Sequence, residues 1–162
     1  MSETNPSEGK VLTFVNRGVN MQLVRIARGS WDVLAVLDDR GRCPVLDFIA
    51  ALGANYTAAK RGLLRVLRVE LPQDGPPARN IQRCKALGGG IFEIRRQPKG
   101  QKLRVLFFYD DGRRIVCTNA FAKAERTPRN EVELARAAKQ RYLKAKFRRK
   151  LEIVEEAHDG YG

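Results

Sequence analysis

Apolar and polar positions along the chain follow patterns that predict strands in two regions. WDVLAVLD, residues 31–38, is an apolar run closed by the polar turn DDRG, which predicts a strand. Three further runs, IFEIRRQ, KLRVLFFYD and RRIVCTNAFAK, follow the glycines at 88–90. They are separated by QPKGQ and by Asp111-Gly112, a strong hairpin dipeptide. The pattern therefore predicts three consecutive antiparallel strands in the second half of the chain.

Helical spacing predicts three helices. PVLDFIAAL begins with Pro44, a favoured first residue of a helix, and ends before a glycine. A second helix is predicted over residues 55–71 and is stopped by PQDGPP. Thr127 and Pro128 predict the N-cap and first residue of a third helix, whose apolar lines continue to about Ala157.

The domain organisation follows from these elements. Residues 1–10 have the composition of a disordered segment. The segments VLTFV and MQLVRIA that follow are predicted to form short strands. Met21 offers an alternative start of translation. We expect a flexible extension (residues 1–20), one domain (21–157) and a short tail (158–162). The predicted fold class is α+β, with two N-terminal helices, a long C-terminal helix and a small twisted antiparallel sheet that carries its helices on one side.

Charge is concentrated in two segments. The 162 residues include 31 Lys and Arg against 18 Asp and Glu, a formal net charge of +13, which favours a polyanionic partner such as RNA, DNA or an acidic protein. Residues 79–104 contain eight cations and a single acid, Glu93. Residues 136–150 contain eight more cations and no acid. This concentration favours a functional contact over an inert basic surface.

Composition excludes several classes of site and protein. The three cysteines, Cys43, Cys84 and Cys117, are far apart and odd in number, so we expect reduced thiols. The lone His158 lies near the end of the chain, and the sequence has neither a nucleotide-binding glycine loop nor clustered metal ligands. We therefore expect no cofactor and no metal. No segment has the length of a membrane span and the polar N-terminus lacks a signal-peptide core, so we expect a cytoplasmic protein without a membrane partner.

The remaining chemistry is that of cations held on strands. Alternation places Lys102 and Arg104 on one face of KLRVLFFY, and Glu93 and Arg95 on one face of their own strand. Glu93 could pair with an arginine and simply hold the sheet edge together. Held arginine and lysine groups could equally clamp a phosphate and stabilise the charge that develops on its oxygens.

RNA offers a specific use for such a site. The 2′-OH of RNA can attack the adjacent phosphate, so the protein need not supply a nucleophile. The protein must orient the 2′-OH in line, assist proton transfer and stabilise the negatively charged phosphorane. Lysine and arginine can perform the last task without histidine.

Several segments together resemble the RelE/ParE toxin superfamily, and within it the phage-derived HigB-like branch. They are CKALGGGIFEIR, LRVLFFYDDGRRIVCTNAF, FAKAERTP and ARAAKQRYLKA, and WDVLAVLDDRGRCPVLDFIAAL resembles the family's opening strand and first helix. The resemblance covers about residues 31–145. It implies a RelE-like fold and the toxin of a type II toxin–antitoxin system, a metal-independent endoribonuclease that cleaves mRNA, often on the ribosome. The implied partners are mRNA, the ribosome and a cognate antitoxin of the helix-turn-helix type.

The resemblance also implies roles for individual residues. Arg95 and Arg104 would face the scissile phosphate as catalytic residues, with Lys85 and Lys123 nearby and Glu93 orienting an arginine. Tyr142 is a further candidate from the resemblance, and the cations concentrated in the two basic segments and at the family's lysine position complete the expected RNA-binding set: Arg96, Lys99, Lys102, Arg126, Lys144 and Arg148. Because Tyr142 lies on an apolar line of its predicted helix, packing is an alternative role for its ring.

The chain departs from the family pattern in three places. Ala124 stands where the family has a second lysine, for which Arg126 is an available substitute. The N-terminal extension and the basic segment beyond Tyr142 also exceed the usual short toxin. Two alternatives to a growth-inhibiting mRNA interferase therefore stay open: an RNA- or ribosome-binding module without catalysis, and a ParE-like gyrase inhibitor on the same fold.

Overall fold

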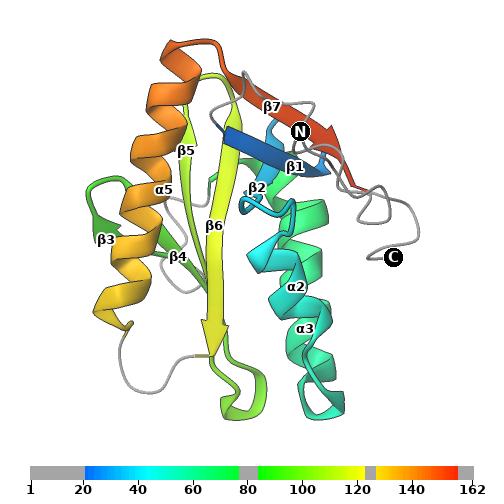
Figure 1. Cartoon of the computed structure of the whole chain (residues 1–162). Coiled ribbons are helices and arrows are strands. Elements are labelled where there is room, and N and C mark those ends of the chain that lie inside the picture. The colour runs from blue at the N-terminus through cyan, green and yellow to red at the C-terminus, as the bar shows by residue number, and fades with distance from the viewer. Residues whose placement is uncertain (1–20, 77–83, 123–126, 157–162) are drawn as a thin grey trace.

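A seven-stranded sheet forms the centre of the molecule. The structure, a computed structural model, describes residues 21–76, 84–122 and 127–156. The strand order is β3-β4-β5-β6-β2-β1-β7 (Figure 1). The strands are β1 (Met21–Ala27), β2 (Asp32–Val36), β3 (Cys84–Gly88), β4 (Ile91–Arg96), β5 (Leu103–Asp110), β6 (Arg114–Ala122) and β7 (Leu151–Glu155).

The prediction of a small antiparallel sheet is wrong, because the sheet is larger and mixed. β3, β4, β5 and β6 are antiparallel neighbours, but β2 pairs with β6 in parallel and β1 pairs with β7 in parallel. Parallel partners must be joined by long crossover connections. Asp32 of β2 lies opposite Arg114 of β6, far away in sequence, and no local pattern reveals such a pair.

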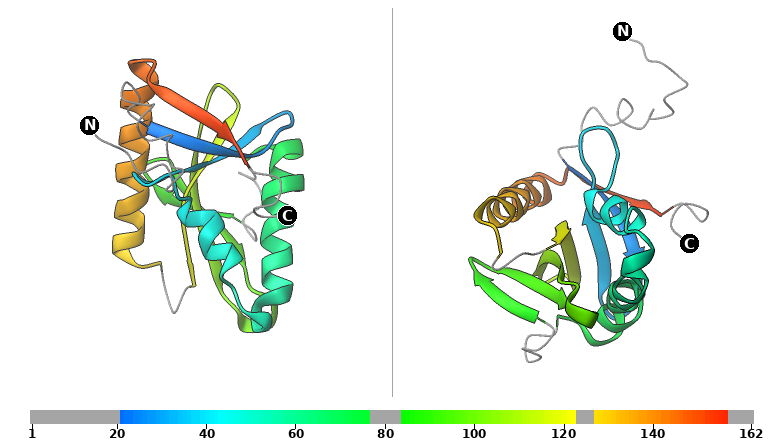
Figure 2. Two further views of the ribbon diagram at one scale, coloured as in Figure 1. Left: turned by 45° about the vertical axis from the view of Figure 1, so that its right-hand side comes forward. Right: turned by 90° about the horizontal axis from the view of Figure 1, so that it is seen from below.

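Helices cover both faces of the sheet, which also corrects the prediction that they lie on one side. Helix α2 (Pro44–Ala50) and the segments η2 (Ala54–Tyr56), α3 (Thr57–Arg65), η3 (Val66–Glu70) and α4 (Leu71–Asp74) cover one face. Helix α5 (Arg129–Phe147) covers the other, as both views in Figure 2 show. Each face has its own apolar core. Val105 and Phe107 of β5 point into the core under α2 and α3, whereas Leu106 and Phe108 point toward α5.

The second predicted helix is interrupted rather than continuous. Residues 57–65 are α-helical, but residues 66–70 form a π-helical segment before α4 resumes at Leu71. Pro72 lacks an N–H, and its ring collides with the carbonyl four residues earlier in an α-helix. The wider π turn, in which the Leu71 amide donates to the Val66 carbonyl, relieves that crowding and lets the helix pass through the proline.

The third predicted helix ends ten residues earlier than expected. Helix α5 stops at Phe147, and residues 151–155 form strand β7 instead of a further helical turn. Arg149 takes a positive φ of 57°, and the amide of Lys150 donates to the carbonyl of Ala145 across 2.7 Å, which closes the helix. The β-branched pair at 153 and 154 then favours an extended chain beside β1.

The predicted N-terminal extension lies outside the described residues, as do VLTFV and the tail at 158–162. The predicted strand MQLVRIA is confirmed as β1, and WDVLAVLD contains β2. None of the helices described combines the length and the apolar character needed to cross a membrane.

Candidate active site

Four charged residues predicted for the site lie on one face of three neighbouring strands. Lys85 of β3 is directly opposite Glu93 of β4, and Arg95 of β4 is directly opposite Arg104 of β5. Directly opposed residues project from the same face of a sheet, and residues two apart on a strand share a face. Because Leu106 lies on the α5 face, Arg104 and its three companions lie there too.

Glu93 and Arg104 form a buried ion pair at the centre of this group. The two side chains are 0% and 2% exposed, and 3.6 Å separates Nε of Arg104 from Oε1 of Glu93. That separation is too long for a hydrogen bond. Neither atom has a hydrogen-bond partner among the described residues. The pair is therefore close enough for charge attraction but leaves hydrogen-bonding capacity unused at the point where the two groups face each other.

The other ends of both groups are held in place. Arg104 donates from Nη1 to the carbonyl of Leu103 across 3.0 Å, and from Nη2 to the side-chain oxygen of Gln97. The hydroxyl of Thr127, just before α5, donates to Oε2 of Glu93. Sequence reasoning missed Gln97 and misassigned Thr127, because the N-cap of α5 is Pro128 and no side chain caps the helix. Thr127 instead connects the start of α5 to the ion pair.

Arg95 gives the cluster a net positive charge. Its half-buried side chain lies opposite Arg104, and its Nε is buried without a hydrogen-bond partner among the described residues. Burial lowers the pKa of Arg104, Glu93 raises it and Arg95 lowers it, with a net decrease. Two arginines and one carboxylate carry one excess positive charge, to which the exposed Lys85 adds another. An anion bound between the arginines would satisfy both the charge and the unused donors.

The structure separates other predicted residues from this cluster. Arg96 lies on the opposite face of the sheet, where its guanidinium covers Gly62 of α3. Lys102 is exposed just before β5, and Lys144 and Arg148 are exposed at the far end of α5. Lys123 and Arg126 lie outside the described residues, and so does the side chain of Lys99.

Tyr142 belongs to a different network at the other end of β5. Its side chain is fully buried, and its ring packs edge-on against Phe108 with 5.2 Å between ring centroids. Its hydroxyl donates to Asp110 and accepts from Arg114 across 3.4 Å. Burial, together with the hydrogen bond to Asp110, raises the pKa of Tyr142 to about 12, although Arg114 opposes the shift. Asp110 is six residues from Arg104 along β5, about 20 Å, so Tyr142 packs and does not reach the cluster.

Thiol and metal chemistry find no support in the described part of the chain. Cys43, Cys84 and Cys117 are buried and unpaired, and burial raises the pKa of all three thiols, to about 11 for Cys43 and Cys84. High thiol pKa values oppose reactivity. In the described ranges, no group of three or more His, Cys, Asp and Glu side chains is placed to hold a metal ion. The group formed by Lys85, Glu93, Arg95 and Arg104, here called the cationic cluster, is therefore the strongest candidate for a catalytic site.

The class of protein follows from a family comparison. Residues 47–142 match the family of phage-derived Gp49-like proteins, and this segment runs from α2 to the middle of α5. The chain therefore belongs to the Gp49-like family, which is related to the RelE/HigB-like toxins. No curated protein matches the sequence significantly. The matched segment contains the whole cationic cluster, whereas β1, β2 and β7 lie outside it.

Proposed function

We propose that this protein is the toxin of a type II toxin–antitoxin system and cleaves mRNA, with the ribosome presenting the message. The observation that carries the proposal is the direct opposition of Arg95 and Arg104 on β4 and β5, beside a single buried carboxylate. Membership of a toxin-related family supports the same reading. A cognate antitoxin, expected to be of the helix-turn-helix type, would neutralise the excess positive charge.

The proposed reaction uses the RNA's own nucleophile. The 2′-OH attacks the adjacent phosphorus, its proton leaves to a base, and the bond to the 5′-oxygen breaks as that oxygen takes up a proton. The products are a 2′,3′-cyclic phosphate and a 5′-hydroxyl. Arg95 and Arg104 stabilise the additional negative charge on the phosphorane oxygens. Glu93 is a positioning residue, because it holds Arg104 and does not itself face an anion.

Proton transfer falls to lysine in this proposal. Lys85 is exposed and lies opposite Glu93 across β3 and β4, on the same face as both arginines. Lys123 is the second candidate from the family resemblance and lies outside the described residues. A lysine beside two guanidinium groups is a suitable proton donor to the departing 5′-oxygen.

A matched pair of neighbouring arginines tests the assignment. Arg95→Gln and Arg96→Gln make the same chemical change on adjacent residues of β4 whose side chains lie on opposite faces. The 5′ ends of cellular mRNA are mapped shortly after induction of wild type and of each variant. We expect new cuts within translated frames for wild type and Arg96→Gln, and their loss with Arg95→Gln. Equal cutting by Arg95→Gln, at equal soluble protein, would remove the catalytic assignment.

One observation favours the alternative of a binding module without catalysis. Arg104 is 2% exposed, and both of its terminal nitrogens already donate to protein oxygens. If wild type arrests growth and co-sediments with ribosomes but produces no new 5′ ends, this alternative replaces the endonuclease. A DNA-damage response without mRNA cuts would instead indicate gyrase inhibition.

A further inference from the structure

The C-terminal end of α5 carries a large apolar side chain that the fold does not use. Phe147 is 88% exposed, more than any other large hydrophobic residue in the described ranges. Leu143, one turn earlier on the same line of the helix, is 42% exposed. A single exposed apolar residue needs no explanation on its own. The residues that surround Phe147, however, call for an explanation.

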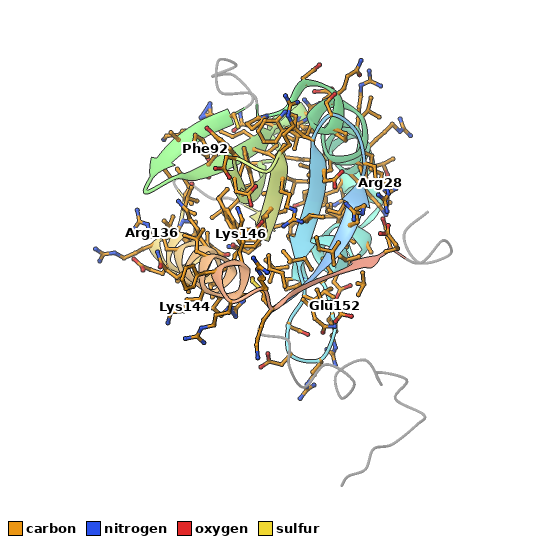
Figure 3. The ribbon with its side chains drawn as sticks, turned by 90° about the horizontal axis from the view of Figure 1, so that it is seen from above. Arg28, Phe92, Arg136, Lys144, Lys146 and Glu152 are labelled. Carbon is orange, nitrogen blue, oxygen red and sulfur yellow. The ribbon has the colours of Figure 1, made fainter. Side chains whose placement is uncertain are left out.

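Cations surround this phenylalanine. Lys144, Arg148, Arg149 and Lys150 are exposed, and none of them has a carboxylate partner in the described part of the chain. Lys146 differs, because its ammonium is 3.1 Å from Asp110 and turns toward the sheet, whereas Lys144 points away from it (Figure 3). Cations at a helix C-terminus interact favourably with the helix dipole. That effect favours cations at this end but does not explain an exposed phenylalanine among them.

Two exposed arginines at the same end have backbone conformations that glycine adopts more readily. Among the described residues, Arg113 (φ 59°) and Arg149 (φ 57°) are the non-glycine residues with positive φ. Arg149 occupies the position after a helix where glycine is usual, since the Arg149 and Lys150 amides donate to Lys146 and Ala145. Arg113 lies in the β5–β6 turn, whose Asp111 is 3.6 Å from Lys146 of α5. Both residues are exposed. The β5–β6 turn and the C-terminal end of α5, to which they belong, lie at one end of the molecule, at the top of Figure 1.

We propose that this end binds unpaired RNA nucleotides. The surface, here called the basic cap, comprises Arg113, Lys144, Phe147, Arg148, Arg149 and Lys150. Phe147 would stack on an unpaired base while the surrounding cations contact phosphates, the combination that recurs in single-strand binding sites. A stable complex with an acidic protein would bury about 800 Å² of this surface around an apolar core. The exposed apolar side chains here are Phe147 and part of Leu143, which suit a single base better than such a core.

The basic cap is distinct from the candidate active site. Thr127, which contacts Glu93, precedes the first turn of α5, and Phe147 ends the helix about 28 Å away. The inference rests on the proposed function in taking RNA as the ligand. It adds a second contact several nucleotides from the scissile phosphate, which would help to fix which phosphate reaches Arg95 and Arg104.

The first test measures stacking without cleavage. A fluorescent, 2′-O-methylated single-stranded RNA of about twelve nucleotides is titrated with wild type, Phe147→Ala and Leu134→Ala. Leu134 is the matched control, because it is 56% exposed on the same helix but lies beside Glu131 and Glu133. We expect Phe147→Ala to weaken binding by about 5- to 100-fold and Leu134→Ala to leave it unchanged. Equal affinity of all three proteins would overturn the proposal.

A tryptophan at position 147 reports the contact directly. In Phe147→Trp, the RNA should quench the indole fluorescence and binding should be as tight as in wild type. Wild type is the blank, because its single tryptophan, Trp31, lies against Tyr109 in the core on the other face of the sheet. Tight binding without quenching beyond that blank would overturn stacking and indicate a purely electrostatic contact.

Arg149→Gly should raise thermal stability but weaken RNA binding, so it separates an effect on binding from an effect on folding. Glycine relieves the positive φ, so the midpoint of thermal unfolding should rise. The loss of one phosphate contact should weaken binding and lower the slope of log K against log salt by about 0.7. Unchanged affinity and slope would exclude Arg149 from the surface. If wild type binds no RNA, the inference fails, while the proposed function, in which the ribosome presents the message, is decided by the 5′-end mapping. Normal mRNA cutting by Phe147→Ala with unaltered cut sites would also overturn the inference alone.

Discussion

Two carboxylates lie on the sheet face covered by helix α5, one near each end of the helix, and their surroundings differ. Asp110 accepts hydrogen bonds from the Tyr142 hydroxyl, the Lys146 ammonium and the Gly112 amide. Glu93 accepts from Thr127 through one oxygen, but its other oxygen faces Nε of Arg104 across 3.6 Å without a hydrogen bond. Glu93 is also the more deeply buried, with a side-chain exposure of 0% against 8% for Asp110.

The difference separates an end of the helix whose polar groups are all hydrogen-bonded from one whose polar groups are not. A buried polar network stabilises a fold when every member is satisfied and is costly when it is not. The end of α5 near Asp110 meets this condition, because the groups around that carboxylate are hydrogen-bonded. These bonds hold the C-terminal end of α5 against the β5–β6 turn. Arg95 and Arg104 at the Glu93 end have buried Nε atoms without a hydrogen-bond partner among the described residues, as does Arg96 on the opposite face of the sheet. Fold stability alone does not favour buried donors that stay unpaired. We propose that a bound anion uses the unpaired donors of Arg95 and Arg104.

Removing the charge of Arg104 should have the largest effect on stability. Arg104→Met would leave Glu93 buried without a counter-charge, and we expect the free energy of unfolding to fall by about 3–5 kcal/mol. Urea unfolding followed by circular dichroism measures the loss. A decrease below about 1 kcal/mol would show that water reaches the pair and that it is not truly buried.

A double variant sharpens this prediction. Glu93→Gln combined with Arg104→Met removes both charges and should recover most of the stability, because a buried pair can be replaced by neutral groups at little cost. RNA cleavage should stay absent in the refolded double variant. Recovered cleavage without Arg104 would contradict its catalytic assignment.

Tyr142→Phe should have an intermediate effect, confined to stability. The substitution keeps the ring packed on Phe108 but removes the hydrogen bond to Asp110, a bond to a charged acceptor worth about 1.5–3 kcal/mol. Cleavage per folded molecule and RNA affinity should equal those of wild type, since Tyr142 is remote from Arg104. Reduced affinity at full folding would restore the role in RNA binding that the family resemblance implies for this residue.

Acid should weaken the Asp110 end in a defined direction. Burial opposes ionisation of Asp110, but hydrogen bonds from Tyr142, Lys146 and the Gly112 amide outweigh it and hold its pKa below the ordinary value of 3.8. Its contribution is therefore fully present above the unfolded pKa and is lost as the pH falls through the lower folded pKa. Compared with wild type, Asp110→Asn should be less stable at neutral pH and lose less stability below pH 4. Parallel stability curves for the two proteins would contradict the depressed pKa.

Sequence patterns predicted the strands that carry the cluster, whereas the choice of Arg95, Arg104 and Lys85 came from the family resemblance. Alternation along KLRVLFFYD placed Arg104 on the face opposite Val105, and Asp111-Gly112 located the β5–β6 turn. The three glycines at 88–90 take positive φ values, from 64° to 93°, and form a turn that pairs β3 with β4 and brings Lys85 opposite Glu93.

What could not be predicted depends on contacts between distant segments. Arg95 and Arg96 are adjacent cations, and only the pairing of Arg95 with Arg104 and the position of Gly62 under Arg96 separate their roles. Strand β7 was taken for helix because Leu143, Phe147 and Leu151 follow a helical spacing. Its pairing with β1 joins residues 130 apart, through contacts such as Gln22 with Glu152.

The smallest expected effect concerns Gln97, the exposed side chain that bonds Arg104. If the arginines bind phosphate, Gln97 occupies a donor, Nη2, that the substrate would use. Gln97→Ala should then lower stability by only about 0.5–1.5 kcal/mol and lower KM for RNA while leaving kcat unchanged. The steady-state kinetics of a model RNA provide the measurement. A lower kcat at unchanged KM would instead make Gln97 a positioning residue, and the Glu93 end would then be preorganised for catalysis rather than left open for the ligand.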